Sequence, residues 1–104
     1  MKLSNLSDTQ ARMWAAQKKK HLNKPVEYHF AHAGEEIGEA FKEYRKGRLT
    51  TRREDGKLEG LPIELADVIL TVCIIAEGFD IDLATAVEMK LSELEAATIK
   101  KEHL

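Results

Sequence analysis

The sequence predicts an all-α fold of four helices, in a single domain that spans residues 1–104. Two stretches carry most of this prediction. From Val26 to Tyr44, apolar residues recur at steps of three and four, which is the spacing of one helix face. From Pro62 to Glu77, apolar residues fall on nearly every side, and a helix of that kind is expected to be buried. No stretch shows the alternation that is typical of a half-buried strand.

Local start and stop signals place the first two helices. Ser7 and Gln10 form a capping-box pattern, which predicts a first helix that begins there and runs to about Lys20. Pro25 suits the first turn of a second helix, because its missing N–H group needs no partner at that position. Gly47 is the expected end of this helix, since glycine readily adopts the left-handed conformation that follows a helix.

Similar signals place the remaining elements. Residues 48–60 form a polar connection without periodicity, in which Asp55-Gly56 predicts a turn. Pro62 opens the third helix and Gly78 closes it. Asp82 is the expected N-cap of the last helix.

Composition excludes several classes of protein. The net charge of -2, from 16 basic and 18 acidic residues, argues against a general binder of nucleic acids or of membrane surfaces. No apolar run approaches the ~20 residues of a membrane span, and the N-terminal stretch lacks the apolar core of a signal peptide. Cys73 is the only cysteine, so no internal disulfide can form. We therefore expect a soluble, cytoplasmic protein.

Carboxylates accompany the apolar face of the second helix. The residues expected to turn inward lie on one side: Phe30, Ile37, Phe41 and Tyr44. Glu36 falls at the edge of this face and Glu39 lies further round, so both can meet a buried neighbour. His32 and Glu43 lie in one line with Glu36 and Glu39, beside this apolar stripe of the helix. Glu35 points more toward solvent.

The third helix carries a second pair of carboxylates. Glu64 and Asp67 lie three residues apart on one side of a helix without a solvent face, where two bare carboxylates are costly to bury. If the second and third helices are antiparallel, their two pairs converge. Four adjacent carboxylates cannot all stay ionised without cations, and hard oxygen ligands suit Mg²⁺ or Mn²⁺. Because bound Mg²⁺ keeps open positions for phosphates, the pattern points to phosphate chemistry.

Other interpretations of these residues stay open. Glu64 and Asp67 can instead belong to a buried ion network, in which case the chain is a helical interaction module. The basic residues that can pair with them are Arg45, Arg48 and Lys90. A di-iron bundle is not favoured, because the Glu-x-x-His pairs that such sites use are missing. The basic clusters at residues 18–20 and 45–53 are either solvated or attract a polyanion such as a triphosphate.

Two motifs resemble those of a known family. EEIGE at residues 35–39 and ELAD at residues 64–67 resemble the EExxE…ExxD signature of the MazG-like all-α nucleoside triphosphate pyrophosphohydrolases. The similarity continues to residue 91, through a glycine turn, an Ile-Asp-Leu helix start and a lysine in the last helix. It covers about Phe30 to Leu91, which is most of the chain.

This resemblance implies a four-helix bundle that hydrolyses a nucleoside triphosphate to the monophosphate and pyrophosphate, with Mg²⁺ required. The implied metal ligands are Glu36, Glu39, Glu64 and Asp67. Glu35, which can be a further metal ligand or orient the attacking water, and Glu39 are the implied catalytic carboxylates, and Lys90 matches a phosphate-binding lysine. Members are generally dimers or dimers of dimers with sites completed across the interface, so a homo-oligomer is expected.

Recognition of the base is less clearly marked. His32, one turn before Glu36, and Trp14 are the side chains that we expect to contact the nucleotide. Leu94 stands where family members often carry asparagine, which is a departure at one phosphate or sugar contact. The rivals to an enzyme of nucleotide-pool cleaning or regulation are a non-catalytic helical dimerisation module and a nucleotide-sensing module.

Overall fold

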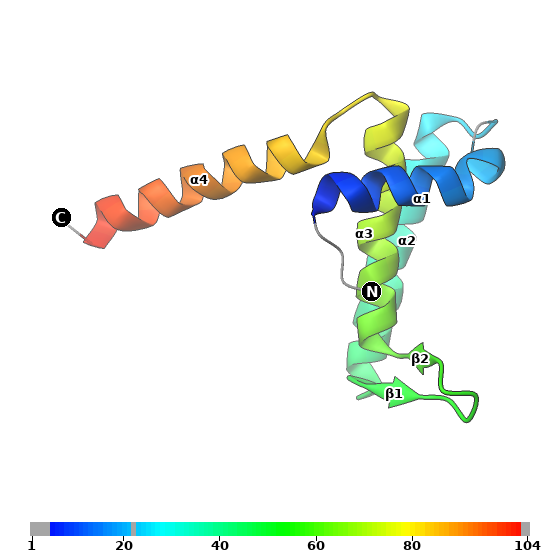
Figure 1. Cartoon of the computed structure of the whole chain (residues 1–104). Coiled ribbons are helices and arrows are strands. Elements are labelled where there is room, and N and C mark those ends of the chain that lie inside the picture. The colour runs from blue at the N-terminus through cyan, green and yellow to red at the C-terminus, as the bar shows by residue number, and fades with distance from the viewer. Residues whose placement is uncertain (1–4, 22, 103–104) are drawn as a thin grey trace.

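The computed structural model describes residues 5–21 and 23–102, which form four helices and one small β-hairpin (Figure 1). The helices are α1 (Leu6–His21), α2 (Val26–Arg45), α3 (Leu61–Gly78) and α4 (Leu83–Glu102). The prediction of an all-α architecture with four helices is therefore confirmed. Within these described ranges, no helix combines the length and the apolar character that crossing a membrane requires.

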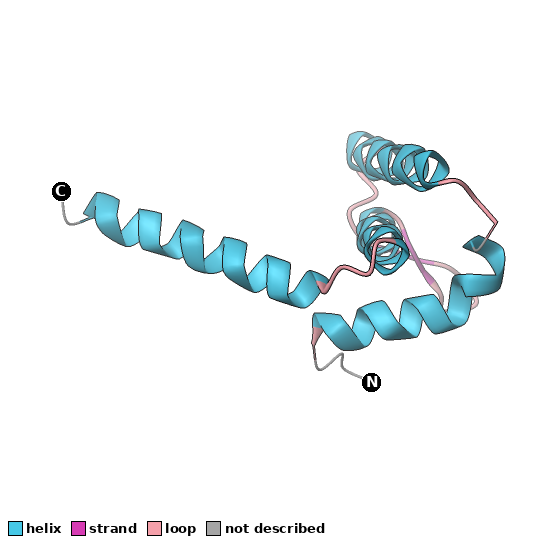
Figure 2. Ribbon diagram, turned by 90° about the horizontal axis from the view of Figure 1, so that it is seen from above, coloured by secondary structure: helices cyan, strands magenta, loops and turns pink. Residues whose placement is uncertain are grey.

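Three of the four helices pack closely together. α2 and α3 run antiparallel as a hairpin, and α1 crosses α3 (Figures 1 and 2). α4 contacts α1 and then extends away from the other helices, which gives the molecule an elongated outline of 52 × 36 × 30 Å. A single chain thus does not place all four helices side by side, as the bundle implied by the family resemblance would.

Asn5 caps α1, two residues before the position that the sequence pattern favours. The N–H group of Asp8 donates a hydrogen bond to Asn5 Oδ1 over 2.7 Å, and the Thr9 hydroxyl donates to the Asn5 carbonyl oxygen over 3.2 Å. Asparagine is as good an N-cap as serine, and the helix begins earlier by using it. The predicted capping box of Ser7 and Gln10 is therefore wrong, and Gln10 has a different role.

The buried side chain of Gln10 joins α1 to the connection between α3 and α4. Its Nε2 group donates to Glu77 Oε1 over 2.8 Å and to the carbonyl oxygen of Ile81 over 2.7 Å. Its Oε1 atom accepts a hydrogen bond from the N–H group of Leu83 over 3.2 Å. One amide thus binds the end of α3, the connection and the first residue of α4, and it fixes where α4 leaves the other helices.

Gly47 ends α2 in a Schellman turn, as predicted, with a φ of 74° that glycine adopts without strain. The N–H group of Gly47 donates to the carbonyl oxygen of Tyr44, and that of Arg48 donates to the carbonyl oxygen of Glu43, both over 3.0 Å. The Arg48 carbonyl oxygen accepts from the N–H group of Leu61 over 2.8 Å. Arg48 therefore lies between the last turn of α2 and the first residue of α3.

The polar connection between α2 and α3 contains a small antiparallel hairpin of β1 (Thr51–Arg52) and β2 (Leu58–Glu59). The predicted turn at Asp55-Gly56 is confirmed, and Gly56 has a φ of 83°. The sequence did not indicate these strands, because two residues are too few to show the alternation of a half-buried strand. The hairpin lies at the end of the α2–α3 pair that is remote from α1 (Figure 1).

Two aspartates direct the chain from α3 into α4. Asp80 takes the left-handed conformation that follows α3, with a φ of 55°, and the N–H group of Ile81 donates to the carbonyl oxygen of Ala76. Asp82 caps α4, as predicted, since its carboxylate accepts hydrogen bonds from the hydroxyl and the N–H group of Thr85. The bond from the hydroxyl is also the main reason that the pKa of Asp82 lies below its ordinary value.

The core where α1, α2 and α3 meet contains few large side chains. Cys73 is fully buried, and Ala40, Ile74 and Ala76 are nearly so. Burial raises the pKa of the Cys73 thiol, which keeps the thiol protonated. Cys73 therefore packs as a small apolar side chain.

α2 turns a different face toward α3 than its apolar stripe predicted. The four residues expected to point inward are each more than half exposed: Phe30, Ile37, Phe41 and Tyr44. The buried residues of α2 are instead His29, Ala40 and Glu43. A small side chain such as Ala40 permits the two helix backbones to approach closely, so the polar residues of this face lie between the helices.

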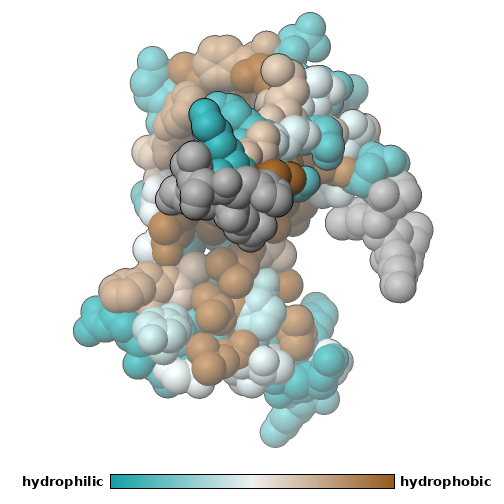
Figure 3. All heavy atoms as spheres, turned by 90° about the vertical axis from the view of Figure 1, so that its left-hand side faces the viewer, coloured by the Kyte–Doolittle hydropathy of each residue, from teal (hydrophilic) through white to brown (hydrophobic). Residues whose placement is uncertain are grey.

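Large apolar side chains remain uncovered on three helices. Besides the stripe of α2, Leu65 and Ile69 of α3 and Met89 and Leu94 of α4 are at least half exposed. Figure 3 shows that apolar side chains gather on the face from which α4 projects. Large apolar side chains that gather on one exposed face are typical of an interface.

We expect Gln10→Ala to destabilise the fold by about 1–3 kcal/mol, because it removes the partner of the Ile81 carbonyl oxygen and of the Leu83 N–H group. Urea denaturation followed by circular dichroism measures this loss. Lys18→Ala, an exposed change on the same helix, is the control and should stay within about 0.5 kcal/mol of the wild type. Equal stabilities of the two variants would show that the amide does not hold α4 to α1.

Candidate functional site

Three carboxylates from two helices converge along the α2–α3 pair. Glu36 of α2 and Glu64 and Asp67 of α3 each offer a carboxylate oxygen, and these oxygens lie within 4.8 Å of one another. All three side chains are half-buried. Oxygen ligands that two rigid helices hold at this separation can bind one divalent cation.

The helix faces explain why these side chains meet. Glu36 lies one turn before Ala40, on the face of α2 that packs against α3. On α3, Glu64 lies in the first turn and Asp67 follows three residues later, so both project from one side. Antiparallel packing then brings the two helix faces together, so that Glu36 meets Glu64 and Asp67.

In the described part of the chain, no lysine or arginine forms an ion pair with these three carboxylates. The side chain that contacts Glu36 is His32, whose Nε2 lies 3.3 Å from Glu36 Oε1. Arg48 pairs with Glu43, and Lys90 pairs with a glutamate of its own helix. The geometry therefore does not favour a buried ion network, because neither Arg48 nor Lys90 forms an ion pair with the three carboxylates, although the charge of Glu64 acts on the Arg48 guanidinium.

Like charges act on Glu64 from both helices. Burial raises the pKa of Glu64 above its ordinary value, and the charges of Asp67 and Glu36 raise it further, followed by those of Glu39 and Glu43. The ionised form of this carboxyl is thus disfavoured by its surroundings. A divalent cation held by these oxygens offsets the repulsion, so the residues present fit such a cation.

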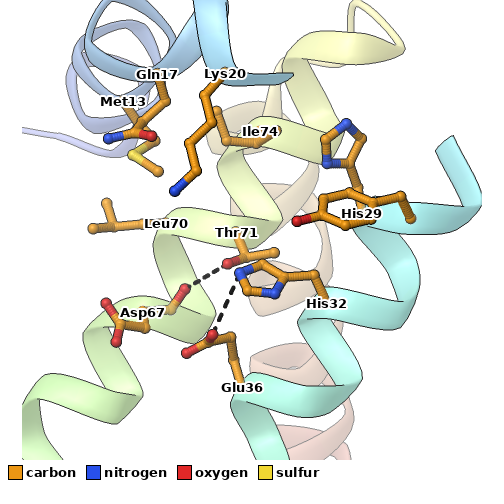
Figure 4. A pocket seen from close by; sticks show the side chains of 11 residues that line it. Met13, Gln17, Lys20, His29, His32, Glu36, Asp67, Leu70, Thr71 and Ile74 are labelled. Atoms are coloured by element: carbon orange, nitrogen blue, oxygen red, sulfur yellow. Dashed lines mark hydrogen bonds and ion pairs between the residues drawn. The ribbon is translucent and has the colours of Figure 1, made fainter. Parts of the chain in front are cut away.

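A cavity of about 410 Å³ opens beside the carboxylates, between α1, α2 and α3 (Figure 4). Its lining comes from all three helices: Met13, Gln17, Lys20, Tyr28, His29, His32, Glu36, Asp67, Leu70, Thr71 and Ile74. Glu36 and Asp67 lie at one end and the α1 side chains at the other. The volume is in the range of small-molecule sites, which measure about 300–1,000 Å³.

Polar groups enter this cavity from opposite sides. His32 points toward Glu36, and the Thr71 hydroxyl donates to the Asp67 carbonyl oxygen over 2.9 Å (Figure 4). The ammonium group of Lys20 extends into the cavity from α1. The cavity therefore combines an anionic end with a cationic side chain across from it.

The two predicted catalytic carboxylates lie beside the convergent group rather than in it. Glu35 is exposed, and its Oε2 lies 3.7 Å from His32 Nδ1. Glu39 is also exposed, yet it is close enough to contribute to the raised pKa of Glu64. Of the four predicted metal ligands, the structure thus brings three together and leaves Glu39 at their edge.

Lys90 and Trp14 do not reach the carboxylates within one chain. Lys90 is exposed on α4, which leads away from α2 and α3 (Figures 1 and 2). Trp14 lines a second cavity of about 390 Å³, together with Val26 and Phe79. His32 and Trp14, which were both expected to contact the base, therefore line different cavities.

Sequence reasoning missed several residues of the cavity beside the carboxylates. Lys20 belongs to a basic run that is also typical of a solvated helix end, so the sequence did not assign it to a site. Nothing in the sequence around Gln17 indicates a role in binding. Both residues come to the site through the crossing of α1 over α3, which is a long-range contact. Thr71 is different, because it follows Asp67 by four residues and so lies on the same side of α3.

Comparisons of the chain with known protein families, with curated proteins and with solved structures find no match in any of the three. Membership of a family therefore stays a prediction. It rests on the two motifs and on the geometry in which Glu36, Glu64 and Asp67 meet.

Without divalent metal, we expect stability to fall as the pH rises above about 4.5, through the raised pKa of Glu64. The folded state holds this proton at pH values where the unfolded chain has lost it, so deprotonation costs the folded state. Glu64→Gln removes that cost, and its melting temperature at neutral pH should exceed the wild-type value by roughly 2–5 °C in chelator. Glu93→Gln, a change at an exposed glutamate, is the matched control and should follow the wild-type curve. Parallel pH curves for the Glu64 variant and the wild type would contradict this expectation.

Proposed function

We propose that the protein is a divalent-metal-dependent hydrolase that converts a nucleoside triphosphate to the monophosphate and pyrophosphate. The observation that carries this proposal is the convergence of Glu36, Glu64 and Asp67 without an ion pair to a lysine or arginine of the described chain. These residues belong to the two motifs that resemble the MazG-like enzymes. The adjoining cavity supports the proposal, because it gives a small ligand a place next to the carboxylates.

Mg²⁺ is the cation that this donor set suits best, with Mn²⁺ as an alternative. The donors are carboxylate oxygens without a thiol, and Glu36, Glu64 and Asp67 would hold the ion. Bound there, such an ion neutralises phosphate charge and lowers the pKa of a coordinated water. Glu39, at the edge of the group, is the fourth ligand that the family resemblance implies.

Glu35 and Glu39 are the carboxylates that we assign to the attacking water. Neither belongs to the group of three, so each retains oxygen atoms that can accept a proton. His32 contacts Glu35 and Glu36 at 3.7 and 3.3 Å and can hold both side chains in place. The proton of the water thus passes to a carboxylate of α2 and not to one of the metal-holding residues of α3.

The cavity is the place that we assign to the nucleoside. The rings of Tyr28 and His32 are stacked at its α2 side, with an interplanar angle of 7°, and aromatic surface of this kind suits a base. Gln17 can donate to and accept from a base, and Lys20 can donate to it. Trp14 lies in the other cavity, so we no longer assign it a direct contact with the same base.

A second copy of the chain is the partner that the uncovered apolar surfaces favour. The stripe of α2 and the exposed residues of α3 and α4 have no cover within the described part of one chain. α4 carries Lys90 away from the carboxylates of its own chain, so a phosphate contact by Lys90 requires the α4 of another copy. A homodimer, or a dimer of dimers, meets both requirements.

The same apolar surfaces also fit an alternative function, a helical dimerisation module without catalytic activity. In that case neither metal nor nucleotide changes the melting temperature, since a ligand raises it only by binding the folded state. A nucleotide sensor would show the shift without product. Product analysis and metal-dependent melting separate the three functions.

We expect the wild type, with Mg²⁺ and a panel of ribo- and deoxyribonucleoside triphosphates, to release monophosphate and pyrophosphate. Asp67→Asn should lower this turnover at least about 100-fold and abolish the metal-dependent rise in melting temperature, because it weakens a metal ligand. Asp8→Asn, on the exposed first turn of α1, is the control and should keep wild-type turnover. Near wild-type turnover by Asp67→Asn would remove Asp67 from the metal site.

We expect Ile37→Glu to lower the molar mass measured by light scattering at micromolar concentration, because it puts a charge into the exposed stripe of α2. Lys42→Glu changes an exposed position of the same helix that lies outside the stripe, and it should leave the mass unchanged. If self-association uses another surface, both variants will have the wild-type mass.

A further inference from the structure

Arg48 lies at the hairpin end of the carboxylate group. The Schellman turn at Gly47 folds it back over the last turn of α2, and its carbonyl oxygen accepts from the N–H group of Leu61 at the start of α3. Glu64 lies in the same first turn of α3. The guanidinium is close enough for Glu59 and Glu64 to act on it electrostatically.

A buried carboxylate fixes the orientation of this guanidinium. Glu43 is only 6% exposed, and its Oε1 accepts a hydrogen bond from Arg48 Nη2 over 2.6 Å, while its Oε2 lies beside Nε. One hydrogen bond and a second close ion-pair contact from the same buried carboxylate orient the plane of the arginine fork. The position of Arg48 is thus set before any ligand arrives.

Only part of the hydrogen-bonding capacity of Arg48 is used. A guanidinium has five N–H donors, and one of those at Nη2 donates a hydrogen bond to Glu43, while Nε only lies within ion-pair distance of Glu43 Oε2. In the described residues the guanidinium has no other hydrogen-bond partner, and the Arg48 side chain is 43% exposed. The Nη1 edge therefore remains able to bind an anion, and arginine suits phosphate oxygens well.

The order of residues along α3 indicates which end of a bound ligand would lie near Arg48. Ile74, Thr71 and Asp67 line the cavity in turn, and Glu64 and Leu61 follow toward the hairpin. A ligand with its nucleoside in the cavity therefore has its phosphates over the carboxylates and directed toward Arg48. The chain at this end is basic, since residues 45–57 contain six basic and two acidic residues.

We propose that Arg48 binds the terminal phosphates of the nucleoside triphosphate and, after hydrolysis, the pyrophosphate product. The identity of the ligand rests on the proposed function, whereas the position of Arg48 rests on its contacts with Glu43 and Leu61. Glu43 positions Arg48, and Arg48 contacts the phosphates. The nucleoside and the pyrophosphate thus occupy opposite ends of one site.

The test compares two ligands on the full-length protein by isothermal titration calorimetry with Mg²⁺. Arg48→Gln should bind pyrophosphate roughly 10- to 100-fold more weakly than the wild type, which is the range for lost hydrogen bonds to a charged group. Its affinity for the nucleoside monophosphate should stay unchanged, because that ligand lies at the cavity end. Arg48→Lys, which keeps the charge but loses the fork, should fall between the two.

Glu43→Gln distinguishes phosphate binding from a structural role of the ion pair. It removes the charge of the partner and leaves Arg48 in place, so pyrophosphate should bind as tightly as to the wild type or more tightly. Equal losses in Arg48→Gln and Glu43→Gln, or equal weakening for both ligands, would overturn the proposal and reduce Arg48 to a structural partner of Glu43.

Measurements of turnover and of pyrophosphate binding can refute the proposed function and the role of Arg48 independently of each other. A wild-type protein that binds pyrophosphate through Arg48 but releases no product keeps this inference and loses the proposed function. A wild-type protein that turns over and whose Arg48→Gln variant binds pyrophosphate normally keeps the function and loses this inference. A wild-type protein that does not bind pyrophosphate also overturns the assignment of Arg48.

Discussion

Repulsion between carboxylates on two closely packed helices is the constraint on which the rest of this structure depends. α2 approaches α3 through a face that contains Ala40 and buried polar residues, so Glu36 comes within reach of Glu64 and Asp67. Burial, and then the charges of Asp67 and Glu36, raise the pKa of Glu64 above its ordinary value. Elsewhere the fold neutralises such a charge, since Glu43 on the same face is paired with Arg48. The group of three has no such partner in the described chain, which is why an external cation is the simplest account of it.

Because polar residues occupy the face of α2 that packs against α3, the apolar residues of this helix are exposed. The large apolar residues of α2 are displaced to the outside, and α3 and α4 add apolar surface of their own. The described chain therefore has a small core and a large uncovered apolar area, a combination that suits an interface. The carboxylate group and the uncovered apolar surface of α2 thus arise from the same packing of α2 against α3.

The sequence predicted those features that depend on neighbours along the chain. The end of α2 at Gly47 and the cap of α4 at Asp82 follow from backbone preferences, and the pairing of Glu64 with Asp67 follows from helix spacing. It did not predict which face of α2 meets α3, because the apolar stripe and the face of small and polar residues both fit a helix, and only tertiary packing selects between them. Gln10 was missed for the same reason, since its three hydrogen bonds span about 70 residues of sequence.

The amide of Gln10 also bears on how copies of the chain can assemble. Because it holds the first residue of α4 against α1 and α3, the exit direction of α4 is set within each chain. If α4 leaves each chain in one fixed direction, two copies related by a two-fold axis can each bind the α4 of the other. Such a dimer is closed, because neither copy has a contact surface left for a third. If α4 could instead leave the chain in many directions, each copy could bind the α4 of a different neighbour, and the copies would form an open-ended polymer. If copies of the chain associate through α4, this glutamine of the first helix would favour a closed pair over open-ended growth.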